Sequence, residues 1–140
     1  LSEDLRLTYK NIFRDLKLIQ AWIFKYDNTK KGINVHADQA SVNVNFWITH
    51  NKANLNPASG GLEVWNKVPP EEWDFDTYNN DLNLPRLKQF LSENKSVKQV
   101  IPYKENRVVV FNSKLFHSTD TFNFRDNYAD RRINITFLYD

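Results

Sequence analysis

Two histidines and one aspartate are the residues of this sequence whose types and spacing could bind a metal ion. His36 and Asp38 are one residue apart, and in an extended segment residues i and i+2 project to the same side. An imidazole nitrogen and a carboxylate oxygen could therefore meet at one point. His117, far downstream, would add a third ligand from a distant strand. Two histidines and one carboxylate leave coordination positions open, which is the arrangement of non-haem iron(II) enzymes that activate oxygen.

Each of these residues also has a purely structural interpretation. His36 and Asp38 could be a loop histidine beside a turn aspartate, because this spacing arises by chance in many proteins. His117 could be a core histidine that hydrogen-bonds to backbone. The remaining histidine, His50, falls in a polar loop, which argues against a site of three histidines. The pattern of the neighbouring segments favours the metal site.

Two predicted strands have one apolar face and one polar face. In the strand predicted at 41–49 the even positions are apolar, while Asn43 and Asn45 share the other face. Asparagine disfavours strands, so these two amides indicate a polar cavity, with a polar surface as the alternative. The strand predicted at 131–139 has the same pattern, and its polar face carries Arg132, Asn134 and Thr136. We predict that both apolar faces lie under an N-terminal helix and that the polar faces point inward together.

The last predicted strand brings an arginine to that polar face. Alternation places Arg132 inside and Arg131 outside, and Arg131 is the alternative if the register slips by one residue. A guanidinium presents a planar fork that matches a carboxylate with two hydrogen bonds, and without a partner it would be costly to bury. The arginine could instead form a surface pair with Asp126, Asp130 or Asp140.

Length and composition indicate a single mainly β domain. The chain has 140 residues, of which 41% are hydrophobic and 14% aromatic, which favours a sheet-rich fold. We predict a helix within 1–17, strands at 18–26, 41–49, 62–65, 97–103, 107–112, 114–120 and 131–139, and an insertion at 66–94 that contains a short helix at 84–93. The insertion is either a rim or lid of the site or a packing elaboration.

Charge and hydropathy exclude several function classes. The net charge is only +2, no basic tract contains interleaved aromatics, and no apolar run approaches the roughly 18 residues of a membrane span. We therefore predict neither a nucleic acid nor a membrane as partner. Cysteine is absent, which excludes disulfides and thiolate metal sites. We expect a cytoplasmic location, where reduced iron is easier to maintain, and the lack of methionine predicts a piece of a longer protein. The oligomeric state stays open.

Four motifs occur in order along residues 18–140. They are His36-Ala37-Asp38, Gly60-Gly61-Leu62, the segment 106–111 that leads into His117, and Arg132-Ile133-Asn134-Ile135-Thr136. The set resembles the Fe(II)- and 2-oxoglutarate-dependent dioxygenases, close to the prolyl hydroxylase and phytanoyl-hydroxylase-like branches. This resemblance implies a double-stranded β-helix, or jelly roll. It also implies hydroxylation of an unidentified small-molecule or peptide substrate, with release of succinate and CO2.

The resemblance implies a role for each residue that matches the family pattern. His36, Asp38 and His117 would bind iron, and Arg132 would bind the distal carboxylate of 2-oxoglutarate. Other polar residues would contact 2-oxoglutarate or support the metal ligands, and these are Asn45, Asn43, Thr136 and Tyr26. Two aromatic residues would either wall the pocket or belong to the core, and these are Trp47 and Trp65.

Two further function classes stay open. A cupin-like metalloenzyme that does not use 2-oxoglutarate would want a His-x-His pair, which this sequence lacks. A non-catalytic jelly-roll module could bind a sugar through Trp65 and Trp73 without any metal. The substrate stays open in every case, because the fold class does not define it.

Overall fold

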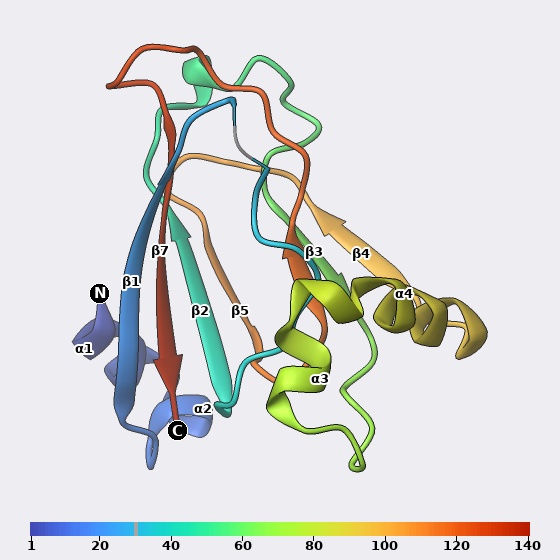
Figure 1. The fold of residues 1–140 in the computed structure, drawn as a ribbon. Coiled ribbons are helices and arrows are strands. Elements are labelled where there is room, and N and C mark those ends of the chain that lie inside the picture. The colour runs from blue at the N-terminus through green and yellow to red at the C-terminus, as the bar shows by residue number, and fades with distance from the viewer. Residues whose placement is uncertain (30) are drawn as a thin grey trace.

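Two antiparallel sheets form most of the computed structural model, which describes residues 1–29 and 31–140 (Figure 1). Sheet A has the strand order β1-β7-β2-β5, and sheet B has the order β4-β3-β6. The strands are β1 (Leu18–Tyr26), β2 (Val42–Trp47), β3 (Leu62–Trp65), β4 (Lys98–Ile101), β5 (Val108–Asn112), β6 (His117–Thr119) and β7 (Arg132–Tyr139). The helices are α1 (Ser2–Thr8), α2 (Lys10–Phe13), α3 (Phe75–Asn79) and α4 (Leu84–Glu93), with short 3-10 turns η1 (Asn51–Ala53) and η2 (Asp81–Asn83). The prediction of a mainly β fold is confirmed.

The predicted strands are all present, but most are shorter than predicted. The ends of β1 and β3 agree with the prediction, whereas the strand predicted at 114–120 is reduced to β6. A turn takes up its first part, because Leu115 donates its backbone N–H to Asn112 O and Lys114 donates to the Asn112 side chain. None of the helices in the described part of the chain is long and apolar enough to cross a membrane.

The prediction of one continuous N-terminal helix is wrong. The chain breaks at Tyr9, where φ is −113° and ψ is 55°, and continues as α2. The break lets Leu5 of α1 and Phe13 of α2 both pack on sheet A, whereas Tyr9 remains 52% exposed. Ser2 lies inside α1 without capping it, and its hydroxyl accepts a hydrogen bond from Tyr139. Packing against the sheet therefore overrides the helical pattern of the sequence.

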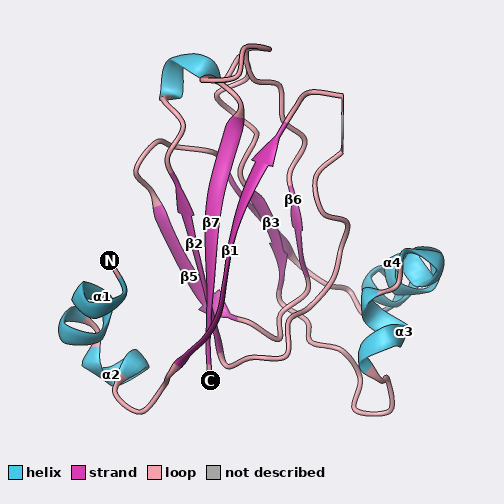
Figure 2. Cartoon of the chain, turned by 60° about the vertical axis from the view of Figure 1, so that its left-hand side comes forward, coloured by secondary structure: helices cyan, strands magenta, loops and turns pink. Residues whose placement is uncertain are grey.

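Sheet A has the predicted apolar outer face and polar inner face. Val44 and Tyr139 are fully buried under Leu5 and Phe13. The inner face carries the buried polar residues Asn43, Asn45, Arg132, Asn134 and Thr136. In Figure 2, α1 and α2 lie on one side of the sheets and α3 and α4 on the opposite side. The polar residues therefore face sheet B.

Two glycines bring β3 close to the neighbouring backbone. Gly60 has a φ of 87°, which favours glycine. At Gly61, an added Cβ would lie 1.9 Å from the carbonyl oxygen of Ile101, so no side chain fits there. The carbonyl groups of both glycines accept hydrogen bonds from Arg132.

The insertion folds over the segment that carries the first histidine. Helix α4 has the predicted bounds, whereas α3 and η2 were not predicted. Tyr78, Leu87 and Leu91 from the insertion form one buried cluster with Ala37 and Phe116. Because Ala37 lies between His36 and Asp38, the insertion packs directly behind the proposed ligands.

Candidate metal centre

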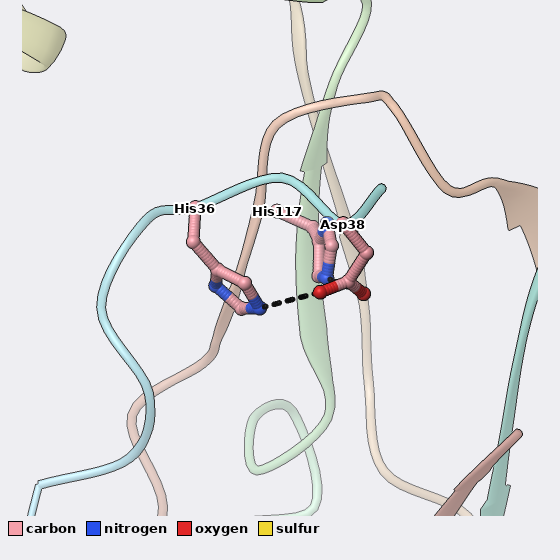
Figure 3. Close-up of side chains that lie close together, drawn as sticks. All are labelled: His36, Asp38 and His117. Carbon is pink, nitrogen blue, oxygen red and sulfur yellow. Dashed lines mark ion pairs between the residues drawn. The ribbon is translucent and has the colours of Figure 1, made fainter. Parts of the chain in front are cut away.

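The structure brings His36, Asp38 and His117 together (Figure 3). One potential ligand atom of each lies within 4.8 Å of the other two. His36 Nε2 is 3.8 Å from Asp38 Oδ1, and His117 Nε2 is 3.4 Å from Asp38 Oδ2. Two ligands about 2.1 Å from an ion and at right angles are about 3 Å apart. Small side-chain shifts would therefore place all three on one ion.

Backbone pairing places the two imidazoles side by side. His36 donates its N–H to His117 O at 3.0 Å, and His117 donates its N–H to His36 O at 2.9 Å. Residues that exchange both hydrogen bonds of an antiparallel bridge project their side chains to the same face. The ring centroids are accordingly 4.2 Å apart. This bridge adds the segment before Asp38 to the edge of β6.

Each imidazole also has its orientation set by a carbonyl group. His36 Nδ1 lies 2.8 Å from Asn34 O, and His117 Nδ1 lies 2.8 Å from Leu115 O. A carbonyl oxygen only accepts, so both Nδ1 atoms carry the proton. Both Nε2 atoms are directed at Asp38. The backbone thus satisfies one nitrogen of His117 and leaves the other for a metal.

The electrostatics of the site favour the protonation states that bind metal. Burial, followed by repulsion from His117, lowers the pKa of His36 to about 4, so His36 is neutral at neutral pH. Burial alone would raise the pKa of Asp38, but His117, His36 and Asn43 outweigh it and hold that pKa below its ordinary value. The carboxylate is therefore charged, and the imidazole has no proton to lose before it binds a cation.

A chain of amide hydrogen bonds joins the triad to Arg132. Arg132 Nη1 donates to Asn134 Oδ1 at 2.7 Å, and Asn134 Nδ2 donates to Asn45 Oδ1 at 3.2 Å. Asn45 Nδ2 then donates to Asn43 Oδ1 at 3.1 Å. Asn43 Nδ2 completes the chain by donating to Asp38 Oδ2 at 2.9 Å. Every link runs from the cation toward the carboxylate, so the amides orient both ends of the site.

One cavity between the sheets holds the triad and the arginine. Its volume is about 170 Å³. The polar residues predicted from the sequence all line it, and these are His36, Asp38, His117, Arg132, Asn43, Asn45, Thr136 and Tyr26. The other lining residues are Trp22, Phe24, Ile33, Leu62, Ser118, Thr119 and Asn134. Of the two tryptophans, Trp47 is fully buried in the core and Trp65 lies outside this cavity.

Arg132 is buried and has no carboxylate partner among the residues that the structure describes. It is 1% exposed, and burial lowers its pKa to about 10. Its Nε donates to Gly60 O at 2.6 Å and its Nη2 to Gly61 O at 3.2 Å. The surface pairing with an aspartate is therefore not formed by the described residues. Arg131 does not line the cavity, which agrees with the predicted register.

The Tyr26 hydroxyl is buried and has no hydrogen-bond partner among the described residues. It lies near Thr119 and Arg132 but makes no hydrogen bond of normal geometry to a described residue. Burial raises the pKa of Tyr26, so the hydroxyl keeps its proton. It can donate a hydrogen bond to a ligand in the cavity.

Asn79 supports the ligands and carries no signal in the sequence that identifies this role. Its Oδ1 accepts a hydrogen bond from the backbone N–H of Ala37 at 3.1 Å. Asn34, two residues before His36, donates its side-chain amide to the Asp81 carboxylate at 2.9 Å. The insertion thus binds the backbone of Ala37 after His36 and the side chain of Asn34 before it. Asn134 of the amide chain was likewise absent from the predicted site, although alternation along β7 had placed it on the inner face.

A solved structure of known activity has a similar fold. The chain is similar to an N-substituted L-amino acid dioxygenase from Burkholderia ambifaria AMMD, with a TM-score of 0.53 and 14% identity. The similarity covers 96% of this chain and 57% of that enzyme, so the chain spans little more than half of its length. No family model and no curated protein sequence matches the chain. At this identity the likeness is one of fold.

The pKa of His36 predicts how acid affects the metal-free protein. In the unfolded chain a histidine titrates near 6.5, whereas folded His36 titrates at about 4. Between these values the unfolded state binds more protons, so the contribution of His36 to stability is lost as pH falls from about 6.5 toward 4. Urea unfolding of the wild type and of His36→Gln across this range measures the effect. Equal pH dependence in both proteins would contradict it.

Removal of the Asn79 amide should weaken metal binding. Asn79→Ala leaves the buried N–H of Ala37 without an acceptor and loosens the segment between two ligands, and we expect metal affinity to fall about tenfold. Titration with Mn²⁺ followed by electron paramagnetic resonance measures the affinity. Asn79→Asp keeps the acceptor and serves as the control. Unchanged affinity in a folded Asn79→Ala protein would show that the contact does not position the ligands.

Proposed function

We propose that this protein is an Fe(II)- and 2-oxoglutarate-dependent dioxygenase that hydroxylates a small-molecule or peptide substrate. The proposal rests on the side chains that line one cavity. A group of two histidines and one aspartate lies at one end, and a buried arginine without a carboxylate partner among the described residues lies in the same cavity. A metal and an organic anion are the two ligands that these ends require.

The triad fits iron(II) in its donor set, and His36 and Asp38 fit it in their protonation states. His36 and His117 would bind it through Nε2, and Asp38 through a carboxylate oxygen. Iron(II) with 2-oxoglutarate supplies the activation of dioxygen, with release of succinate and CO2. Asn43 holds the Asp38 carboxylate in place through its side-chain amide. Retention of a carboxylate ligand at Asp38 favours hydroxylation over halogenation.

The far end of the cavity fits the distal carboxylate of 2-oxoglutarate. Arg132 has five N–H groups, and its three hydrogen bonds to Gly60, Gly61 and Asn134 leave two for a ligand. The Tyr26 hydroxyl adds a third donor at the same end. The two oxygens of the carboxylate can accept all three hydrogen bonds, two from Arg132 and one from Tyr26, since a carboxylate oxygen accepts more than one hydrogen bond.

The two remaining predicted contacts orient the middle of the cavity. Thr136 Oγ1 accepts hydrogen bonds from both Asn45 and Asn134 at 3.2 Å. Its own proton is then available to a ligand. Asn45 acts through the amide chain that links Arg132 to Asp38. These side chains exclude water and hold fixed dipoles around the proposed co-substrate.

The fold supports the same proposal. The two antiparallel sheets agree with a jelly roll that encloses its site, and a dioxygenase has a similar fold. We assign the whole of 1–140 to one such oxygenase domain, with 66–94 as the segment that supports and borders the site. The prolyl hydroxylase and phytanoyl-hydroxylase-like branches stay the families that its motifs resemble.

Anaerobic titration with Fe(II) and 2-oxoglutarate tests the proposal. We expect a weak visible absorption band from chelation of the metal by the keto acid, and the band should be absent in His36→Ala. Circular dichroism establishes that both proteins are folded. If the folded wild type shows no band, the non-catalytic binding module becomes the better interpretation.

Removal of one hydroxyl tests the anion end separately. Tyr26→Phe deletes a single hydrogen-bond donor and keeps the ring, so 2-oxoglutarate should bind about tenfold more weakly while Mn²⁺ binds as before. Isothermal titration of each ligand measures both affinities. Tyr128→Phe, at an exposed tyrosine outside the cavity, is the matched control. Equal 2-oxoglutarate affinity in the Tyr26 and Tyr128 variants would place the carboxylate elsewhere.

A further inference from the structure

A second and larger hollow lies against β6, the strand that also borders the metal cavity. Its volume is about 840 Å³. Its wall combines residues 28–29 and 31–35, Glu63 and Trp65 of β3, residues of α4, and the chain from Ser118 to Phe122. The proposed function leaves this hollow without a role, although it is several times larger than the cavity between the sheets.

The hollow gathers lysines from three separate parts of the chain. Lys31 precedes the metal-ligand segment, Lys88 belongs to α4, Lys95 follows α4, and Lys98 begins β4. Only Lys98 has a carboxylate partner among the described residues, because it forms an ion pair with Glu63. The other three lysines line the hollow with unpaired charge. Like charges that face one concave surface concentrate a positive potential there.

The two acidic residues of the hollow are already engaged. Glu63 binds Lys98 and also accepts a hydrogen bond from the Ser118 hydroxyl at 3.1 Å. Asp120 accepts the backbone N–H of Gly60 at 3.1 Å and the Thr121 hydroxyl at 3.3 Å. Neither carboxylate is therefore free to neutralise the three lysines. The three lysines are exposed, so their charges remain available to an anion from outside the chain.

The C-terminal cap of α4 positions one of these lysines. Lys95 ends the α4 turn with a φ of 49°, a conformation in which glycine or asparagine is preferred. The backbone N–H of Ser96 donates to Leu91 O at 3.2 Å, so this conformation is that of an ordinary cap at the C-terminus of α4. The conformation places Lys95 on the wall of the hollow.

The hollow and the metal cavity share one border. Ile33, Ser118 and Thr119 line both. At this border Ile33 donates its N–H to Thr119 Oγ1 at 3.1 Å, and Gly32 passes so close that an added Cβ would lie 2.3 Å from Thr119 Cβ. Ile33 is 36% exposed. A molecule that passes over Ile33 could therefore contact the lysines and the metal cavity together.

We propose that the lysine-lined hollow binds the anionic end of the substrate, so that the substrate is a small molecule carrying a carboxylate or phosphate away from its reacting carbon. This assignment rests on the proposed oxygenase function. Lys31, Lys88 and Lys95 attract the anion, and the apolar wall at Trp65 and Leu91 contacts the carbon skeleton. Lysine suits this role because its ammonium group acts as a point charge toward either kind of anion.

Nuclear magnetic resonance titrations with pyrophosphate and with citrate test the site in the metal-free protein without 2-oxoglutarate. In the wild type we expect saturable amide shifts at Ser92, Lys95 and Ser118 with at least one of the two probes. The double variant Lys88→Glu/Lys95→Glu should bind the probe at least about tenfold more weakly, because two attractive charges become repulsive. A response to only one probe identifies phosphate or carboxylate as the preferred group.

A matched variant separates a specific site from general charge. Lys10→Glu/Lys104→Glu makes the same charge change at exposed lysines that do not line the hollow, and it should bind the probe within about twofold of wild type. Equal weakening in both double variants would overturn the proposal. So would the absence of saturable shifts, or shifts confined to Arg132 and Asn134, which would place the anion in the inner cavity. These results do not depend on iron, so they are distinct from a failure of the oxygenase assignment.

Discussion

The backbone bridge between His36 and His117 is the constraint on which the site depends. Two segments far apart in the sequence exchange a pair of N–H···O hydrogen bonds there, which directs both imidazoles to one face. The carbonyls of Asn34 and Leu115 then set which ring nitrogen carries the proton. Without this pairing, the spacing of His36 and Asp38 would be only a local pattern. With it, the edge of sheet B becomes a preorganised ligand set.

The polar interior of sheet A follows from this constraint. Asp38 is charged and mostly buried, so it needs hydrogen-bond donors, and Asn43 begins a chain of amides that ends at Arg132. The arginine in turn needs carbonyl acceptors, which the close approach of Gly60 and Gly61 supplies. Buried polar groups of this kind are tolerated because nearly every donor has an acceptor. The Tyr26 hydroxyl has no hydrogen-bond partner among the described residues and Arg132 has two unused N–H groups, and both side chains line the cavity.

Alternation along the strands explains how much of the site could be predicted from the sequence. The placement of Asn45 and Arg132 on one inner face required only the two-residue period of β2 and β7. The amphipathic pattern of α4 was also sufficient. The break at Tyr9 was not predictable, because it depends on where Leu5 and Phe13 meet the sheet. Two other features depend on tertiary contacts, and no local sequence pattern predicts them. They are the hydrogen bond from Ala37 to Asn79 and the clustering of lysines around the hollow.

Anomalous diffraction at the iron absorption edge tests the central claim most directly. Crystals grown anaerobically with Fe(II) and 2-oxoglutarate should show one strong anomalous peak bounded by His36 Nε2, His117 Nε2 and an Asp38 oxygen. Density for the keto acid should extend from that peak to Arg132 and Tyr26. A peak at any other position, or none at full iron loading, would contradict the assignment of a metal centre between the two sheets.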